Sequence, residues 1–526
     1  MVKSPEPSRT VLQVEMNRFK NYFLPVILVA AYPVLALYAY NVEAVDAINA
    51  LRPLMISLGA AVLLLLLFRL ILRHWGKASL VTSITLIMFF SYGHLYSAAK
   101  QLNESTVSLG HHRIFAPLFL VVWLLLFWLI ARQKGDLRVA NQTVTVIAAI
   151  ALIFPLFSMG RFLLNRSHTA SAAVEQQTAT LAAGGTKPDI YYIILDGYSR
   201  DDTLQDFFDY DNSEFLQALE DMGFYVARCS QSNYAQTQLS ISSSTNMDYL
   251  QSIDKIYDDP QNTSRAALPG MIRSSTVRKF LEEQGYEIIG FDSGFSWTNL
   301  IDADFYLAPS VGSVKYMGMS GGANEFEVLL LKTSAGLLLA DASIKLPELL
   351  KPDLSGPRRL HRERILYILD ELPKIPRLPS PKFTFAHIVA PHTPYVFGSN
   401  GEPIGGEVDG VAAYRDQLIY VNKRVLPVLQ QIIEGSETPP VIVLQADHGG
   451  VRTNLQDRMR ILNAYYLPQG GEAELYPGIS PVNSFRLILN HYFGTSYPLL
   501  EDTAYHSGYE TPYDYTLVKD SRPGCE

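Results

Sequence analysis

The chain has 526 residues, of which 48% are hydrophobic, and a formal net charge of −8. This length exceeds one ordinary hydrophobic core, so we expect more than one structural unit. The negative charge gives a nucleic-acid partner no electrostatic support, and none is expected. The two cysteines, Cys229 and Cys525, are too few for a disulfide framework or a cysteine metal site. Because Cys525 lies in what looks like a frayed tail, we expect no bridge between them.

Five apolar stretches occupy the first third of the chain, each with about the 17–25 residues that a helix needs to cross hydrocarbon. No small-residue cleavage site follows the first stretch, which argues against a signal peptide. Lys and Arg gather in the N-terminal arm and in the second–third and fourth–fifth connections. The positive-inside rule then places the N-terminus in the cytoplasm and the chain after the fifth span outside. We predict a transmembrane domain over residues 1–165 with spans at Tyr22–Tyr40, Pro53–Leu72, Ser79–Ala99, Ile114–Ala131 and Ala140–Met159.

Residues 166–186 are rich in Ala, Thr, Gln and Gly without an apolar period, which predicts a linker. From residue 187 to 526, short apolar runs alternate with segments of helical spacing, while Pro309–Gly356 follows neither pattern. The alternation predicts an α/β domain with a mostly parallel sheet and helices on both faces. We expect strands at Asp189–Leu195, Glu287–Phe291, Lys382–Ala390 and Pro440–Ala446, and helices at Asn212–Met222, Thr276–Gln284, Ala412–Ile433 and Val482–Tyr492.

Asp196, His392 and Asp447 each follow one of these strands, at the sheet edge where ligands gather in parallel sheets. Asp196 precedes a glycine, which suits a metal ligand, although Asp-Gly is by itself a common turn dipeptide. Asp447 and His448 precede Gly449 and Gly450, which let the backbone turn so that both ligands reach one cation. We favour a metal site over a plain strand–loop junction for this pair.

Two further residues are candidates for catalysis. A helix that starts near Thr237 would direct backbone N–H groups at an anion, and a metal-bound threonine hydroxyl can attack phosphorus. Plain N-capping explains Thr237 equally well. His392, between Pro391 and Pro394, is rigidly presented and could donate a proton to a leaving oxygen. His387 lies within the predicted strand, and we interpret it as a core histidine or a neighbour of the ligands.

These strings resemble the alkaline-phosphatase/sulfatase superfamily over roughly Lys187–Gly494. Pro188–Gly197 is similar to its opening strand and first metal ligand, and Asp447–Gly449 to its second ligand pair. Phe385–Pro394 is similar to the sulfatase segment whose histidine contacts the transferred group. Sulfatases carry Cys or Ser, then Pro and Arg, at the nucleophile, whereas this chain has Thr237-Gln-Leu-Ser. That string looks like the phosphoethanolamine transferases, which share a multi-span anchor with the lipoteichoic acid synthases.

The resemblance implies an alkaline-phosphatase-like sheet and one divalent metal ion, Zn²⁺ or Mn²⁺. It assigns Asp196, Thr237, Asp447 and His448 as metal ligands, Thr237 also as the nucleophile, and His392 to the leaving group or acceptor. Phosphoethanolamine transferases carry more disulfides and a further histidine after Asp-His-Gly. Here Arg452 lies in that stretch, and it either contacts a phosphate or is a solvated surface arginine.

We therefore expect a sulfatase-like catalytic domain over 187–526, outside a bacterial cytoplasmic membrane. Its expected activity is a metal-dependent phosphotransferase that acts on phosphodiesters, such as phospholipid head groups, through a covalent phospho-threonine. The donor is expected to be a membrane lipid, and the acceptor a glycan or lipid. A hydrolase of phosphate or sulfate esters with water as acceptor is the alternative. A non-catalytic membrane sensor ranks lowest, because all four expected ligand types are present.

Overall fold

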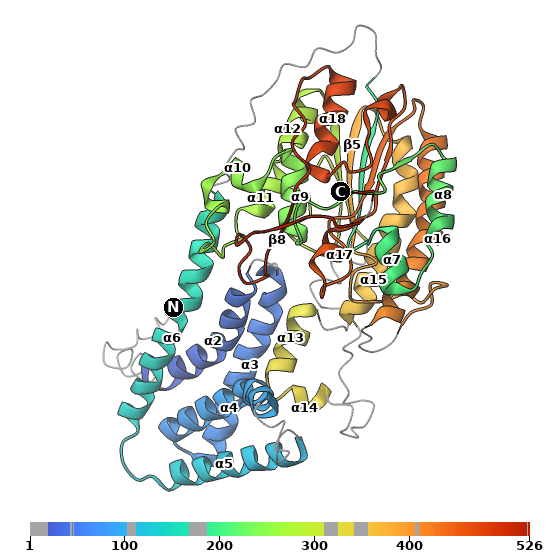
Figure 1. The fold of residues 1–526 in the computed structure, drawn as a ribbon. Coiled ribbons are helices and arrows are strands. Elements are labelled where there is room, and N and C mark those ends of the chain that lie inside the picture. The colour runs from blue at the N-terminus through green and yellow to red at the C-terminus, as the bar shows by residue number, and fades with distance from the viewer. Residues whose placement is uncertain are drawn as a thin grey trace, which may run out of the picture. The chain divides into compact units, whose positions relative to one another are not determined.

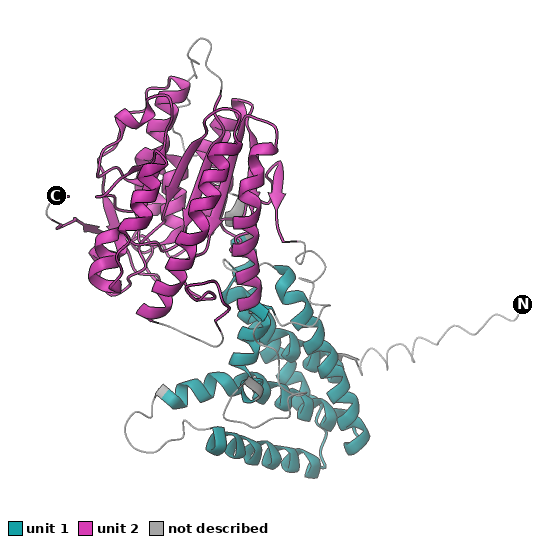
Figure 2. Cartoon of the chain, turned by 90° about the vertical axis from the view of Figure 1, so that its right-hand side faces the viewer, with its two compact units in different colours: residues 1–163, 311–357 teal, residues 164–310, 358–526 magenta. Residues whose placement is uncertain are grey.

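The structure is a computed structural model that describes residues 19–42, 45, 47–101, 112–167, 187–309, 324–340, 356–404, 410–522 and 524–525. The chain divides into two compact units (Figure 2). Unit 1 comprises residues 1–163 and 311–357, and unit 2 comprises residues 164–310 and 358–526. The predicted linker lies outside the described residues from position 168 onward.

Unit 1 is built from long apolar helices. Five helices in the described part of the chain are long and apolar enough to cross a membrane, and their number equals that of the predicted spans. Leucine and phenylalanine side chains point outward from them, with Leu70 and Phe154 more than 70% exposed, as lipid contact requires. The helices are α2 (Leu24–Tyr40), α3 (Ala47–Leu72), α4 (Trp75–Gln101), α5 (His112–Arg132) and α6 (Arg138–Ser167), and a π-helical turn, η1 (Phe19–Phe23), precedes them.

Two short helices from much later in the chain also belong to unit 1. They are α13 (Glu325–Thr333) and α14 (Leu337–Ala340), which lie in the region 309–356 that the sequence pattern left unassigned. Figure 1 shows α13 beside the membrane helices, and it contacts α2, α3 and α4.

Unit 2 is built around a seven-stranded sheet in the described residues, with the order β2-β7-β6-β1-β5-β3-β4. β1 pairs in parallel with β5 and β6, and β3 pairs in parallel with β4 and β5, while β7 is antiparallel to β2 and β6. The predicted fold class, five apolar helices followed by a mostly parallel sheet, is therefore confirmed. The strands are β1 (Ile190–Leu195), β2 (Tyr225–Val226), β3 (Glu287–Phe291), β4 (Phe305–Leu307), β5 (Lys382–Ile388), β6 (Val441–Gln445) and β7 (Asn463–Tyr466).

Helices cover both faces of this sheet, and alternate side chains of β1 enter two separate cores. Tyr191, Ile193 and Leu195 pack in one core, and Ile190 with Tyr192 in the other. In Figure 1 one set of helices lies on each side of β5. The first set is α7 (Asp201–Phe208), α8 (Ser213–Asp221), α15 (Gly356–Glu371) and α16 (Val411–Gly435); the second is α9 (Thr237–Asn246), α11 (Leu268–Arg273), α12 (Thr276–Glu283) and α18 (Pro481–Phe493).

The expectation about the cysteines was wrong, because Cys229 and Cys525 form a disulfide. The C-terminal segment is held in place rather than frayed. Its strands β8 (Ala504–His506) and β9 (Thr516–Val518) pair with each other. Beyond them, the Asp520 carboxylate lies 2.7 Å from the guanidinium groups of both Arg200 and Arg460. These buried contacts bring Cys525 to its partner, and they could not be recognised from the composition of the tail.

Candidate metal centre and active site

The candidate site lies where the central strands β1, β5 and β6 end. Their parallel pairing places the segments after each strand at one edge of the sheet. After β1, Gly197 has a φ of +73°, a conformation that glycine adopts without strain. Its N–H donates to the Asp447 carboxylate at 3.0 Å. Asp196 therefore begins a real turn, as the dipeptide indicated, and that same turn links the two acidic loops.

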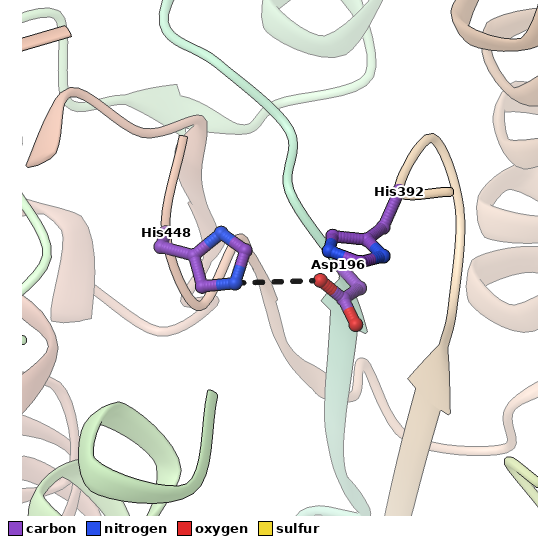
Figure 3. A group of neighbouring side chains, drawn as sticks. All are labelled: Asp196, His392 and His448. Atoms are coloured by element: carbon purple, nitrogen blue, oxygen red, sulfur yellow. Dashed lines mark ion pairs between the residues drawn. The ribbon is translucent and has the colours of Figure 1, made fainter. Parts of the chain in front are cut away.

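The structure brings all five sequence-predicted site residues together. Asp196, His392 and His448 form one group of potential metal ligands, whose ligand atoms lie within 4.8 Å of one another (Figure 3). The His448 Nε2 atom is 3.7 Å from Asp196 Oδ1 and 3.3 Å from Asp447 Oδ2. It is also 3.2 Å from Thr237 Oγ1. Two carboxylates, imidazoles and a hydroxyl thus converge on one small volume.

Three buried atoms of this cluster lack a hydrogen-bond partner among the described residues. They are Asp196 Oδ1, Asp447 Oδ2 and His387 Nε2. Leaving a buried polar atom unsatisfied costs about 1–3 kcal/mol, and more for a charged group. A bound cation would satisfy all three, and mixed oxygen and nitrogen donors suit Zn²⁺ and Mn²⁺. The residues present therefore fit a divalent metal ion.

The ionisation of these groups also favours a cation. Burial raises the pKa of the Asp447 carboxyl, and the neighbouring Asp196 carboxylate raises it further. Burial alone would raise the pKa of Asp196 as well, but the imidazoles around it lower it overall. Burial, together with the positive charge of Arg458, lowers the pKa of His448, so its imidazole is neutral. A neutral imidazole beside two close carboxylates is a donor set that a divalent cation stabilises.

His387 lies at ligand distance from the cluster, although the sequence suggested a core or neighbouring role. It projects from β5, and its Nε2 atom is 3.3 Å from Asp196 Oδ2. Its Nδ1 atom is 2.9 Å from the Thr298 hydroxyl, which orients the ring. His387 forms a second potential ligand group with Asp196 and Asp447. The sequence carried no signal for this role, because His387 becomes level with Ile194 only through the pairing of β5 with β1.

Thr237 is the first residue of α9, and the residue in the N-cap position is Gln236. Among the described contacts, the Thr237 side chain does not cap this helix but approaches His448. The N-capping alternative therefore does not explain it. The first turn of a helix carries N–H groups without intrahelical partners, so an anion at Thr237 would meet a positive helix end.

His392 is held by backbone contacts on a short loop. Its N–H donates to Asp196 O at 3.0 Å, and Gln417 Nε2 donates to its carbonyl at 2.9 Å. Its Nδ1 atom is 2.7 Å from Thr393 O, so this nitrogen carries the proton and Nε2 acts as an acceptor. The Arg452 guanidinium lies 3.2 Å from that Nε2. Of the two interpretations of Arg452, the structure favours a position at the site.

Arg458, on α17 (Leu455–Met459), was not recognised from the sequence. Its Nε donates to Ala235 O at 2.9 Å, and its Nη1 donates to Gly449 O at 2.8 Å. It therefore ties the segment before Thr237 to the Asp-His-Gly loop. Burial lowers its pKa to about 10, which still leaves it protonated at neutral pH.

No family model and no curated protein matches the chain. One similar solved structure is the C-terminal periplasmic domain of EcEptC from Escherichia coli, at 12% identity over 65% of this chain and 95% of that one, TM-score 0.40. That domain is also solved in complex with Zn. Lipooligosaccharide phosphoethanolamine transferase A from Neisseria meningitidis is similar at 10% identity over 89% and 95%, TM-score 0.38.

A protein in the alkaline phosphatase superfamily from Vibrio parahaemolyticus is similar at 10% identity over 66% of this chain and 82% of that one, TM-score 0.38. The solved structures that this chain is similar to thus include members of the superfamily that its motifs resemble, among them membrane phosphoethanolamine transferases.

Proposed function

We propose that the chain is a metal-dependent membrane phosphotransferase. It would take a phosphoryl-linked group from a phosphodiester, such as a phospholipid head group, and pass it to an extracytoplasmic glycan or lipid through a covalent phospho-threonine. One observation carries this proposal. The Thr237 hydroxyl begins α9 and lies 3.2 Å from His448, beside three buried ligand atoms that have no described hydrogen-bond partner. A nucleophile, a cation site and a positive helix end therefore coincide.

Asp196, Asp447, His448 and Thr237 would hold the metal ion, with His387 as a further candidate ligand. When bound, Zn²⁺ or Mn²⁺ supplies Lewis acidity, which lowers the pKa of a coordinated hydroxyl and offsets negative charge on a phosphoryl group. The similarity to a domain solved with Zn supports the choice of zinc as the first ion to test.

The chain's own residues supply the nucleophile and the proton transfers. Thr237 Oγ1 bonds to phosphorus while the bond from phosphorus to the donor's alcohol oxygen breaks. When the Arg452 guanidinium donates to the substrate phosphate instead of to His392, the proton lost by Thr237 passes through water to His392 Nε2 and then to the departing oxygen. In the second half of the reaction, the acceptor hydroxyl attacks phosphorus and gives its proton to His392. His392 returns this proton to the Thr237 oxygen as the bond between that oxygen and phosphorus breaks.

Arg452 supports an anionic substrate at this position. Its guanidinium adjoins His392 Nε2, on the side from which the leaving oxygen would take its proton. A planar guanidinium hydrogen-bonds phosphate oxygens well and stays charged at every relevant pH. Arg458 adds a second positive charge behind the ligand loops, which favours an anionic substrate beside a bound metal ion.

The experiment is product analysis with head-group-labelled phospholipid and the purified full chain in proteoliposomes. Label that moves to a glycan or lipid supports transfer, whereas free labelled head group supports the hydrolase alternative. Thr237→Ala should abolish both, and Gln251→Ala provides a matched polar substitution outside the site. Full activity in Thr237→Ala would contradict the proposal. Equal label release by Thr237→Ala and the unsubstituted chain would assign the chemistry to another group.

We also propose that the N-terminus is cytoplasmic and that unit 2 is extracytoplasmic in a bacterial cytoplasmic membrane. The support is the distribution of Lys and Arg among the loops of five candidate spans. Reporter fusions, with alkaline phosphatase at the C-terminus and a cytoplasmic fluorescent protein at the N-terminus, test this orientation.

A further inference from the structure

The chain makes a detour between two elements of unit 2. It leaves unit 2 after residue 310, joins unit 1, and returns at residue 358. The described part of the detour, residues 324–340, consists of α13, a short turn and α14. At nine and four residues, the two helices are too short to cross a bilayer, which takes about 17–25 residues.

The start of the detour is attached to the start of α3. The Glu327 carboxylate and the Arg52 guanidinium form a two-pronged ion pair, in which Nε and Nη2 each donate to one carboxylate oxygen. Asn324 Nδ2 donates to Asn49 O at 3.1 Å. Glu327 also accepts from the Asn324 N–H at 3.0 Å, in a capping box that begins α13. The Glu327 carboxylate therefore both caps the start of α13 and attaches this helix to α3.

The far end of the detour contacts α4 along its backbone. The Ala335 N–H donates to Phe89 O at 2.7 Å. A Cβ atom added at Gly93 would lie only 2.5 Å from the carbonyl carbon of Thr333, so a side chain there is excluded by this contact. Between the two ends, Phe326 is almost fully buried and packs against Tyr38, with ring centroids 6.5 Å apart. Contacts with α2, α3 and α4 thus hold the segment between Asn324 and Ala335.

The contacts at Phe89 and Gly93 lie far from the C-terminal end of α4. Phe89 lies twelve residues before Gln101, where α4 ends, which is about 18 Å along a helix axis. The hydrocarbon of a bilayer is about 30 Å thick, so this point lies within it. Non-helical backbone is tolerated at that depth only when protein satisfies its polar groups. The turn meets this condition, because Ala335 N–H bonds to Phe89 and Gly336 N–H bonds to Ser334 Oγ.

We propose that residues 324–340 form a re-entrant, membrane-inserted segment, fixed by the Arg52–Glu327 ion pair, through which the chain of unit 2 enters the bilayer and returns. Both flanks of the segment continue into unit 2, so it enters and leaves from one side. The membrane attachment of unit 2 then consists of this segment as well as the connection after α6. The proposal does not depend on the chemistry at Thr237.

The first test is disulfide cross-linking in native membranes of the full chain with added cysteines. Asn49→Cys with Asn324→Cys should cross-link efficiently. Val139→Cys with Asn324→Cys is the control, because Val139 lies at the start of α6, on the predicted cytoplasmic side. Absence of the first cross-link, or equal yields for the two pairs, would overturn the proposal.

The second test measures depth. Leu338→Cys in proteoliposomes should resist a charged maleimide and should react once detergent dissolves the bilayer. Leu499→Cys, an exposed position of unit 2, should react in both conditions. Equal labelling of the two positions in intact proteoliposomes would contradict membrane insertion.

The ion pair is tested by charge exchange in the cross-linking background. Arg52→Gln and Glu327→Gln should each reduce the Asn49–Asn324 cross-link several-fold, because each substitution removes the ion pair. The double exchange Arg52→Glu with Glu327→Arg should restore it. The pair does not fix the segment if the single substitutions leave the cross-link yield unchanged. The same conclusion follows if the yield of the double exchange is as low as that of the single substitutions.

Discussion

The hydroxyl oxygen of Thr237 lies 3.2 Å from Nε2 of His448, although 211 positions separate the two residues in the sequence. α9 presents the first and the loop after β6 presents the second. Arg458 donates to the backbone of both segments and so fixes their separation. This arrangement joins a hydroxyl to the candidate metal centre.

Metal removal should destabilise the protein, and loss of one carboxylate should lower its metal content. A ligand that binds only the folded state stabilises it by about 2.7 kcal/mol at a concentration of 100 times its Kd. Chelation should therefore lower the thermal midpoint, and added Zn²⁺ or Mn²⁺ should restore it. Asp447→Asn should bind much less metal by elemental analysis, whereas Asp370→Asn, an exposed site, should not. Equal metal content in both variants would contradict the assignment of Asp447.

His387→Gln should weaken metal binding while the fold is retained. Its Nε2 atom faces Asp196, and loss of a ligand or of a group that orients one typically costs about 10–100-fold in metal affinity. The measurement is competition with a fluorescent zinc chelator. His491→Gln is the matched control, because His491 lies at the surface beside Glu474. If His387→Gln binds zinc with unchanged affinity, His387 has only a structural role.

Arg452→Gln should lower kcat/KM for an anionic phosphodiester about 10–100-fold, since a charge-assisted hydrogen bond contributes about 1.5–3 kcal/mol. Arg452→Lys should recover part of the loss, because it keeps the charge without the planar fork. The control is Arg228→Gln, which removes an exposed surface pair. If Arg452→Gln and Arg228→Gln behave alike, Arg452 is a solvated surface residue.

The C-terminal ion cluster should make stability depend on acidity. Burial alone would raise the pKa of Asp520, but the hydrogen bond from Arg460 and the charge of Arg200 lower it overall. Because the pKa is lower in the folded state, the ionised carboxylate stabilises the fold. This stabilisation is fully present at a pH above the pKa of the unfolded state, which is about 3.9. This contribution is lost as the pH falls through the folded-state pKa.

Asp520→Asn should accordingly lose about 1–3 kcal/mol near neutral pH and show a flatter decline in acid. Thermal unfolding of the detergent-solubilised chain at a series of pH values measures both effects. Asp206→Asn, whose carboxylate is mostly exposed, should track the unsubstituted chain. A parallel acid decline in Asp520→Asn would show that other groups control the acid sensitivity.

The sequence predicted those parts of the molecule that depend on local pattern. Apolar runs of membrane length predicted the five candidate spans, and the buried strands that precede Asp196 and Asp447 predicted the sheet edge. His387 was interpreted as a core histidine or a neighbour of the ligands, because a histidine inside a strand does not show which groups face it across the sheet. The same limit applies to Arg458, whose partners are carbonyls of two distant loops.

Two other features depend on contacts between distant segments. The C-terminal tail looked frayed because its composition is polar, yet Arg200 and Arg460 hold Asp520 and bring Cys525 to Cys229. Residues 324–340 followed neither a spanning nor an α/β pattern, since they are too short for the first and pack in unit 1 rather than on the sheet.

The most direct test of the proposed function is to look for the covalent intermediate. The full chain, loaded with Zn²⁺ or Mn²⁺, is mixed with a phosphodiester lipid without acceptor, quenched in acid and analysed by peptide mass spectrometry. The proposal predicts a phosphoryl-linked adduct on Thr237 that disappears when acceptor is added and is absent from Thr237→Ala. Turnover of the donor without any adduct on Thr237, or an adduct that persists in Thr237→Ala, would contradict it.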